Sequence, residues 1–306
     1  MRGVGARAVR TFRAALGAWW SDNVPRQGAS LAYYTLFSVG PVLLVAVAIG
    51  GLAFGREAVR GEIVGQIRGL IGTDGARAVQ TLLQGAYHQK AGIFATAVGV
   101  VTFFLTATGA FNELQTALNA IWRVRPKPGI NIRGFLTTRL ISFGLAVAVG
   151  FLLLVSLVVS AALAAAARYL GQRVGGLTAL WTGLNLVISF LVVAFLFGLI
   201  YKVLPDVELK WRNVTVGALV TAGLFTVGKF LIGLYLGQSS VASSYGAAGS
   251  VLVLLLWVYY SAQVVLLGAE FTRLYTAEQG ERPTPMGHAE RDPDAPEQTT
   301  EIGKGE

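Results

Sequence analysis

Lys229 is the residue whose type and position most clearly predict chemistry. It is the only charged side chain in the apolar segment Val214–Leu236. A lysine at the centre of a membrane span costs about 2.5–3.5 kcal/mol on insertion scales, so it marks a functional site by default. Small residues share its helical face, which predicts a face turned toward other helices or a cavity. These neighbours are Ala218, Ala222, Thr226 and Gly233.

The groups expected at the depth of Lys229 are neutral. Glu270 is a tempting counter-ion, but in straight antiparallel helices it lies about 24 Å from that level along the axis. The polar residues at the right depth are Asn185, Ser156 and Ser160. A charged lysine without a carboxylate in reach suits an anionic ligand such as a phosphate headgroup.

Two alternatives explain Lys229 without a ligand. In the first, its long side chain extends to the outer membrane interface. In the second, it pairs with an acid that folds in from the long loop before residue 90. The acids available in that loop are Glu57, Glu62 and Asp74.

The connection Gln238–Ser250 is a second polar feature, because it contains Tyr245 and carries no charge. It either dips back into the membrane and lines a polar cavity, or forms a short exposed turn. Gln263 shares a helical face with Glu270, and we expect this face to point inward and bond to other helices. The candidate substrate path is therefore Lys229, Asn185, Tyr245 and Gln263.

Charged residues of both signs occur at the predicted cytosolic ends of the spans. Mixed signs at one level are compatible with a gate-like network of ion pairs, or with ordinary anchors at the membrane interface. The residues of this candidate network are Glu113, Arg139, Lys202, Asp206, Glu270 and Arg273.

Composition excludes most enzyme classes. The chain of 306 residues is 54% hydrophobic and 13% charged, whereas average soluble domains are about 45–50% apolar and about 25% charged. There is no cysteine and there are two histidines, so thiol chemistry is absent and metal ligands are scarce. Nucleotide-binding loops, zinc-protease motifs and paired carboxylates within the spans are also absent from the sequence. We therefore expect no enzyme, no cofactor and no bound metal.

Six apolar segments are long enough to cross a bilayer, which takes about 20 helical residues. They predict an all-α, multi-pass membrane bundle of six transmembrane helices, because lipid cannot satisfy exposed backbone groups. Seventeen Lys and Arg residues flank one side and seven the other, which predicts that both termini are cytosolic. The segments are Leu31–Phe54, Ala91–Phe111, Leu140–Ala167, Leu180–Leu204, Val214–Leu236 and Ala247–Phe271.

The sequence divides into three regions: residues 1–30, 31–273 and 274–306. The first is a basic amphipathic segment, for which we expect an interfacial helix, the alternative being a solvated helix packed on the bundle. The second is the membrane domain, whose long loop Gly55–Lys90 predicts amphipathic helices at the outer interface. The third has four prolines and excess acid, which predicts a disordered cytosolic tail.

Several stretches together resemble the YihY/virulence factor BrkB family, formerly mislabelled ribonuclease BN. The resemblance covers about residues 19–275 and implies a polytopic bacterial inner-membrane protein, some relatives of which are discussed in lipid or envelope-precursor export. The stretches are Ser30–Ser38, Leu118–Trp122, Tyr201–Asp206, Gly228–Gly237, Ser243–Ser250 and Gly268–Thr272.

Together, the residues and the resemblance favour the movement or export of an amphiphilic anion, such as a lipid or lipid-linked envelope precursor. The alternative is a scaffold for envelope assembly that transports nothing. The expected partners are membrane lipids, anionic ones in particular, with a homo-oligomer left open. Nucleic acid is not expected, because the basic residues flank apolar spans and so match membrane topology.

Overall fold

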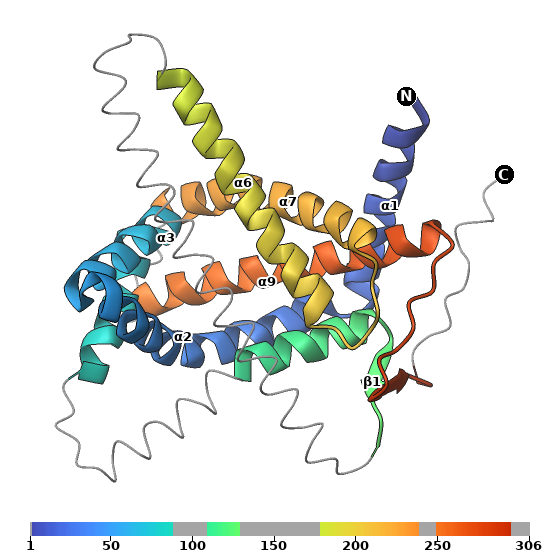
Figure 1. Ribbon diagram of the computed structural model, residues 1–306, viewed down its shortest axis with the longest axis horizontal. Coiled ribbons are helices and arrows are strands. Elements are labelled where there is room, and N and C mark those ends of the chain that lie inside the picture. The colour runs from blue at the N-terminus through green and yellow to red at the C-terminus, as the bar shows by residue number, and fades with distance from the viewer. Residues whose placement is uncertain (1, 88–108, 129–177, 239–248, 295–306) are drawn as a thin grey trace.

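The computed structural model describes residues 2–87, 109–128, 178–238 and 249–294. Within these ranges the chain is helical apart from one short pair of strands and the connections (Figure 1). At one end of the bundle α1 stops, α2 and α7 start, and α6 and α9 stop. We call this end the charged end, because the ion pairs described below gather there.

Three helices form the N-terminal part. α1 spans Arg2–Ser21, α2 spans Val24–Phe54 and α3 spans Arg56–Tyr87. α2 starts with a proline in its first turn, where a missing N–H costs nothing. It ends at Gly55, whose φ of 83° is one that glycine tolerates. The loop predicted to hold amphipathic helices is therefore a single helix, α3, which packs on α2 and α9; its position at the outer interface stays a prediction.

The C-terminal half contains three long apolar helices. α6 spans Thr178–Val203, α7 spans Trp211–Gln238 and α9 spans Gly249–Glu278. Among the described residues, these are the three helices long and apolar enough to cross a membrane. Their bounds agree with the last three predicted segments to within a few residues, except that α9 continues past Phe271.

Of the other three predicted spans, the structure describes one completely. Leu31–Phe54 lies entirely within α2. Leu140–Ala167 and most of Ala91–Phe111 lie outside the described residues. The structure is thus mostly helical, as predicted, and the count of six spans stays a prediction.

The main hydrophobic core joins α6, α7, α9 and the helix at residues 109–121. Aromatic rings connect the three long helices, because Phe225 of α7 lies 5.6 Å from Phe197 of α6 and 6.2 Å from Trp257 of α9 between ring centroids. The largest fully buried members of this core are Leu118, Ile121, Tyr201, Leu204, Val214 and Leu266.

Glycines set the close approach of α7 and α9. The Thr272 side chain lies against Gly217, and a Cβ there would be 2.9 Å from the Thr272 Cβ. Thr221 lies in the same way against Gly268. Small residues at these positions let the two backbones pack closely, as is common between membrane helices.

The chain after α9 differs from its predicted disorder. Residues 281–294, which we call the strap, return along the charged end, and β2 (Ala289–Arg291) pairs antiparallel with β1 (Val124–Pro126). Pro285 also forms a β-bridge with Val207, in the connection between α6 and α7. Residues 274–294 of the predicted disordered region 274–306 are therefore ordered in the structure. They end α9 or form backbone pairs with β1 and Val207, although their composition alone favours disorder. Residues 295–306 lie outside the described residues.

Candidate functional site: buried charges at one end and an exposed lysine on α7

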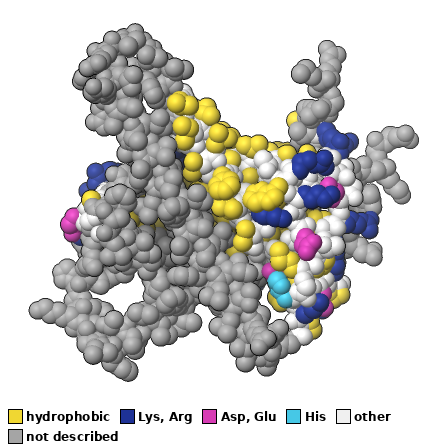
Figure 2. Space-filling model, in the orientation of Figure 1, with side chains coloured by type: hydrophobic (Ala, Val, Ile, Leu, Met, Phe, Trp, Pro, Cys, Tyr) yellow, Lys and Arg dark blue, Asp and Glu magenta, His cyan; other side chains and the backbone are white. Residues whose placement is uncertain are grey.

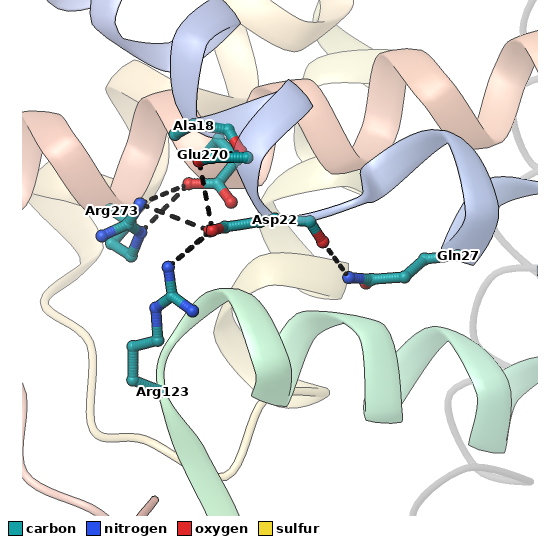
Figure 3. Close-up of polar contacts among 7 residues, drawn as sticks. Ala18, Asp22, Gln27, Arg123, Glu270 and Arg273 are labelled. Atoms are coloured by element: carbon teal, nitrogen blue, oxygen red, sulfur yellow. Dashed lines mark hydrogen bonds and ion pairs between the residues drawn. The ribbon is translucent and has the colours of Figure 1, made fainter. Parts of the chain in front are cut away.

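Four charged side chains meet beneath the turn between α1 and α2, and we call them the ion cluster: Asp22, Arg123, Glu270 and Arg273. Arg123 Nη2 lies 2.7 Å from both carboxylate oxygens of Asp22 (Figure 3). Arg273 donates to Glu270 Oε2 at 2.7 and 3.0 Å, and its Nη2 lies 3.8 Å from Asp22. Glu270 is 0% exposed. The cluster contains two carboxyl groups and two guanidinium groups, so its formal net charge is zero.

The local backbone brings Asp22 and Arg123 together at some conformational cost. Asn23 has φ of 54° and Arg123 has φ of 57°, and they are the two non-glycine residues with positive φ in the described part of the chain. Asn tolerates this conformation, whereas Arg rarely adopts it. Arg123 follows the helix at residues 109–121, in the place where glycine usually ends a helix. We infer that the ion pair with Asp22 holds this strained residue in place.

Buried polar atoms without partners surround the ion cluster. Within the described structure, Glu270 Oε1, Arg123 Nε and the side-chain oxygens of Gln27 and Gln263 form no hydrogen bond. The Gln263 amide nitrogen lies 3.5 Å from the Pro25 carbonyl oxygen, at the limit of a hydrogen bond. Gln263 therefore points inward, as its helical face predicts. Buried atoms of this kind usually have an ordered water as their partner.

A second buried carboxylate, Asp206, organises the strap. Its oxygens accept hydrogen bonds from Gln115 at 3.0 Å and from Asn119 at 2.7 Å. His288 of the strap lies 3.0 Å from Asp206 Oδ1, and the Asp206 carbonyl accepts from the Met286 backbone N–H. The strap is therefore fixed to the connection between α6 and α7 by side chains and backbone together.

The predicted network of cytosolic charges is thus split into separate contacts. Glu270 pairs with Arg273, whereas Asp206 belongs to the strap contacts. Lys202 donates to the Leu209 carbonyl, and Glu113 accepts from the Ser30 hydroxyl at 2.5 Å. Arg139 lies outside the described residues.

Sequence reasoning missed five residues that complete these contacts. Arg123 was identified only as a basic residue of a connection, although its position just before a run of prolines and bases marked a helix end. The polar stripe of the helix at residues 109–121 and the acid between α1 and α2 gave weaker signals. The missed residues are Asp22, Gln115, Asn119, Arg123 and His288.

A further ion pair connects the start of α7 to the strap. Lys210 and Asn213 donate to the Glu281 carboxylate at 3.0 and 2.7 Å. The hydrogen bond from Lys210 is the main reason that the pKa of Glu281 lies below its usual value. The strap is thus attached to α7 as well.

Lys229 lies far from all of these contacts. It follows the first residue of α7 by 18 positions, which is about 27 Å along the helix. The next residue on the N-terminal side, Gly228, contacts the Tyr260 hydroxyl of α9. The small-residue face is buried at Ala218 and Ala222, whereas Lys229 itself is exposed and not packed between helices. Within the described residues no carboxylate pairs with it.

The surroundings of Lys229 are apolar and exposed. Val227, Phe230 and Leu231 are each more than half exposed, with Phe230 at 70%. We call this exposed stretch of α7, with Lys229, Leu234 and Tyr235, the α7 flank; its apolar side chains lie about 100–160° around the helix from Lys229. In Figure 2, drawn in the orientation of Figure 1, hydrophobic side chains cover α6 and charged side chains gather at the charged end.

The other members of the predicted substrate path are only partly visible. Asn185 lies on α6, but its side chain is outside the described part of the structure. Tyr245 is outside it altogether. The structure therefore does not bring the path together, and the path stays a prediction.

The described residues contain three long apolar helices, and ion pairs and the pairing of β1 with β2 connect the chain at the charged end. These features are those of a multi-pass helical membrane protein. The family model for virulence factor BrkB matches residues 15–293. The chain therefore belongs to the BrkB family.

Curated relatives agree with this assignment. A UPF0761 membrane protein of Ralstonia nicotianae is 29% identical over 86% of this chain and 57% of its own length. One of Rhodospirillum centenum is 31% identical over 87% and 57%, respectively. One of Pseudomonas paraeruginosa is 32% identical over 81% and 58%. The chain thus spans less than two thirds of the length of these relatives, and no solved structure matches it.

Proposed function

We propose that this protein moves an amphiphilic anion across the bilayer, a lipid or a lipid-linked envelope precursor, without ATP hydrolysis by this chain. The observation that carries the proposal is that Lys229 is exposed on a helix whose other exposed side chains at this level are apolar. The family and the names of its relatives indicate a membrane protein and say nothing about the substrate.

The chemistry of the α7 flank fits an amphiphile. An ammonium group binds a phosphate as a point charge. Exposed Phe230, about 100° around the helix from Lys229, offers apolar contact for acyl chains. A lysine used only for packing would be buried with a counter-ion, whereas this one is accessible from the lipid phase.

The charged end supplies the other half of the proposal. The ion cluster and the strap connect α7, α9 and the turn before α2 at one level, and in this proposal these contacts close that end to a polar headgroup. Movement of a headgroup past α9 at this end then requires Arg273 to separate from Asp22, because Glu270 and Arg273 belong to the same helix. Gln263, about 10 Å from Glu270 along α9, offers polar contact between the two levels.

The proposal places the protein in a bacterial inner membrane with the charged end and both termini in the cytosol. Its partners are anionic lipids, and it includes no enzymatic step and no cofactor. A periplasm-active reporter should be active after residues 72–84 and inactive after Arg273. The reverse pattern would overturn the orientation.

The function is tested with purified protein in liposomes that contain fluorescent phosphatidylglycerol. We expect reagent added outside to bleach about half of the label in protein-free vesicles and a clearly larger share with protein. Lys229→Met should return bleaching to the protein-free level, and Lys229→Arg should keep part of the activity.

The matched control is Lys210→Met, which removes an exposed lysine at the opposite end of α7. It should leave transport unchanged. If wild-type protein moves neither lipid nor a soluble anion but captures envelope-assembly proteins, the alternative role as a scaffold replaces transport.

A further inference from the structure

α1 divides into three sides with different chemistry. Its apolar stripe consists of Val9, Leu16 and Trp20, which are 61%, 43% and 74% exposed. At about 100° per residue these three side chains lie within about 40° of one another around the helix. Such a narrow, continuous apolar stripe is unusual on a surface that faces only water.

The other two sides of α1 are a side buried against the bundle and a basic side. Thr11 and Ala15 are buried against the bundle, and they lie about 120–160° from Val9 around the helix. Arg10 and Arg13 are exposed on the remaining side, about 40–100° from Val9. The helix contains no acid. The apolar and basic sides are therefore adjacent, and the bundle side lies opposite both.

The contacts of α1 fix its direction. Arg7 and Thr11 donate to Glu278 at 2.9 and 2.7 Å, whereas Asp22, just past the end of α1, lies beside Arg273. From Arg7 to Asp22 α1 advances about 22 Å, while the partners on α9 advance only about 7.5 Å. α1 therefore runs across the end of α9, as Figure 1 shows, and lies close to the plane of a membrane that α9 crosses.

From this geometry we infer that α1 is docked in the leaflet at the charged end, with Leu16 and Trp20 among acyl chains and Arg10 and Arg13 on the phosphates of anionic lipids. Bundle contact on one side leaves exactly two sides free, and these match the two layers of a membrane interface. Tryptophan at the edge of the stripe is typical of that depth. The inference is independent of transport, since it concerns where α1 lies.

The experiment uses the full-length protein in lipid nanodiscs with a single spin label. Because the chain has no cysteine, Leu16→Cys, Trp20→Cys and Gly17→Cys each give one labelled site. Gly17 is the matched control, since it is exposed on the basic side and has open space around it. Collision with oxygen reports contact with lipid, and collision with a water-soluble nickel complex reports contact with water.

Labels at Leu16 and Trp20 should lie about 5–10 Å below the phosphates, and the label at Gly17 should be accessible to water. Replacing phosphatidylglycerol by phosphatidylcholine, or changing Arg10 and Arg13 to Gln, should reduce the docked population, by about fivefold for each arginine. Equal water access at all three sites would overturn the docking. Equal insertion of the α1 labels in phosphatidylglycerol and phosphatidylcholine nanodiscs would overturn the assignment of anionic headgroups.

Discussion

Charged side chains have opposite environments at the two ends of α7. At the start of α7, Lys210 is paired with Glu281, and nearby Glu270 is fully buried with Arg273. In the far half of α7, Lys229 is exposed and within the described residues has no carboxylate partner. Paired buried charges hold helices in a fixed arrangement, whereas an exposed charge on an apolar surface contributes little to the fold. The first end therefore contributes to the fold, and the second is the end to which the proposed function assigns a ligand.

The largest effect is expected when the ion cluster is broken on one side. Arg273→Met leaves Glu270 buried without its partner, so the free energy of unfolding should fall by about 3–5 kcal/mol. Thermal unfolding in detergent measures this loss. Adding Glu270→Gln to Arg273→Met should restore most of the stability, because position 270 then carries no unpaired charge, while Asp22 keeps its partner Arg123.

Arg212→Met is the control for this comparison. Arg212 contacts Glu281 from an exposed position at 3.6 Å, and exposed ion pairs contribute about 0–1 kcal/mol. Equal melting temperatures for Arg273→Met and Arg212→Met would show that the ion cluster does not stabilise the charged end.

A smaller loss is expected at the contact between α7 and α9. In Gly217→Ala the new methyl group overlaps with Thr272 and forces the helices apart, which should cost about 1–3 kcal/mol. Gly223→Ala, on the same helix with open space around it, should be nearly neutral. Melting temperatures of the two variants check this directly, and a neutral Gly217→Ala would contradict the close packing.

The strap should respond more weakly still. His288→Ala removes one of the hydrogen bonds to Asp206, which is worth about 0.5–1.5 kcal/mol. Limited proteolysis should then cut residues 281–294 faster than in the wild type. Thr284→Ala serves as the control, because this residue holds Glu208 through its backbone carbonyl. Unchanged cleavage of the histidine variant would show that backbone pairing alone fixes the strap.

Lys229→Met should have the smallest effect on stability, within about 0.5 kcal/mol, because the side chain is exposed. The melting temperature in detergent measures it. A large drop would mean that Lys229 pairs with an acid in the segments outside the described residues, such as the loop partners considered from the sequence.

The long helices could be predicted because composition leaves few choices. In α6, α7 and α9, runs of apolar residues without charges fit only helices in lipid. The inward direction of Gln263 followed from its spacing to Glu270. The exposure of Lys229 could not be predicted. Helical spacing shows that it shares a face with Ala218 and Ala222, but not how far along α7 the neighbouring helix covers that face.

The ion cluster and the strap could not be predicted in the same way. Asp22 and Arg123 are separated by 101 positions, and only the packing of their helices decides that they meet. The strap has the composition of a disordered tail, yet Pro285 and Ala289 pair with backbone edges that no composition reveals. Long-range pairing of this kind depends on the whole fold.

The central claim is that Lys229 meets an anionic headgroup at the α7 flank. It is tested most directly by the ratio of phosphatidylglycerol to phosphatidylcholine movement in the same liposomes, for the wild type and Lys229→Met. The account predicts that wild-type protein moves the anionic lipid faster and that Lys229→Met removes this preference while the melting temperature stays unchanged. An undiminished preference in a stably folded Lys229→Met protein would contradict it.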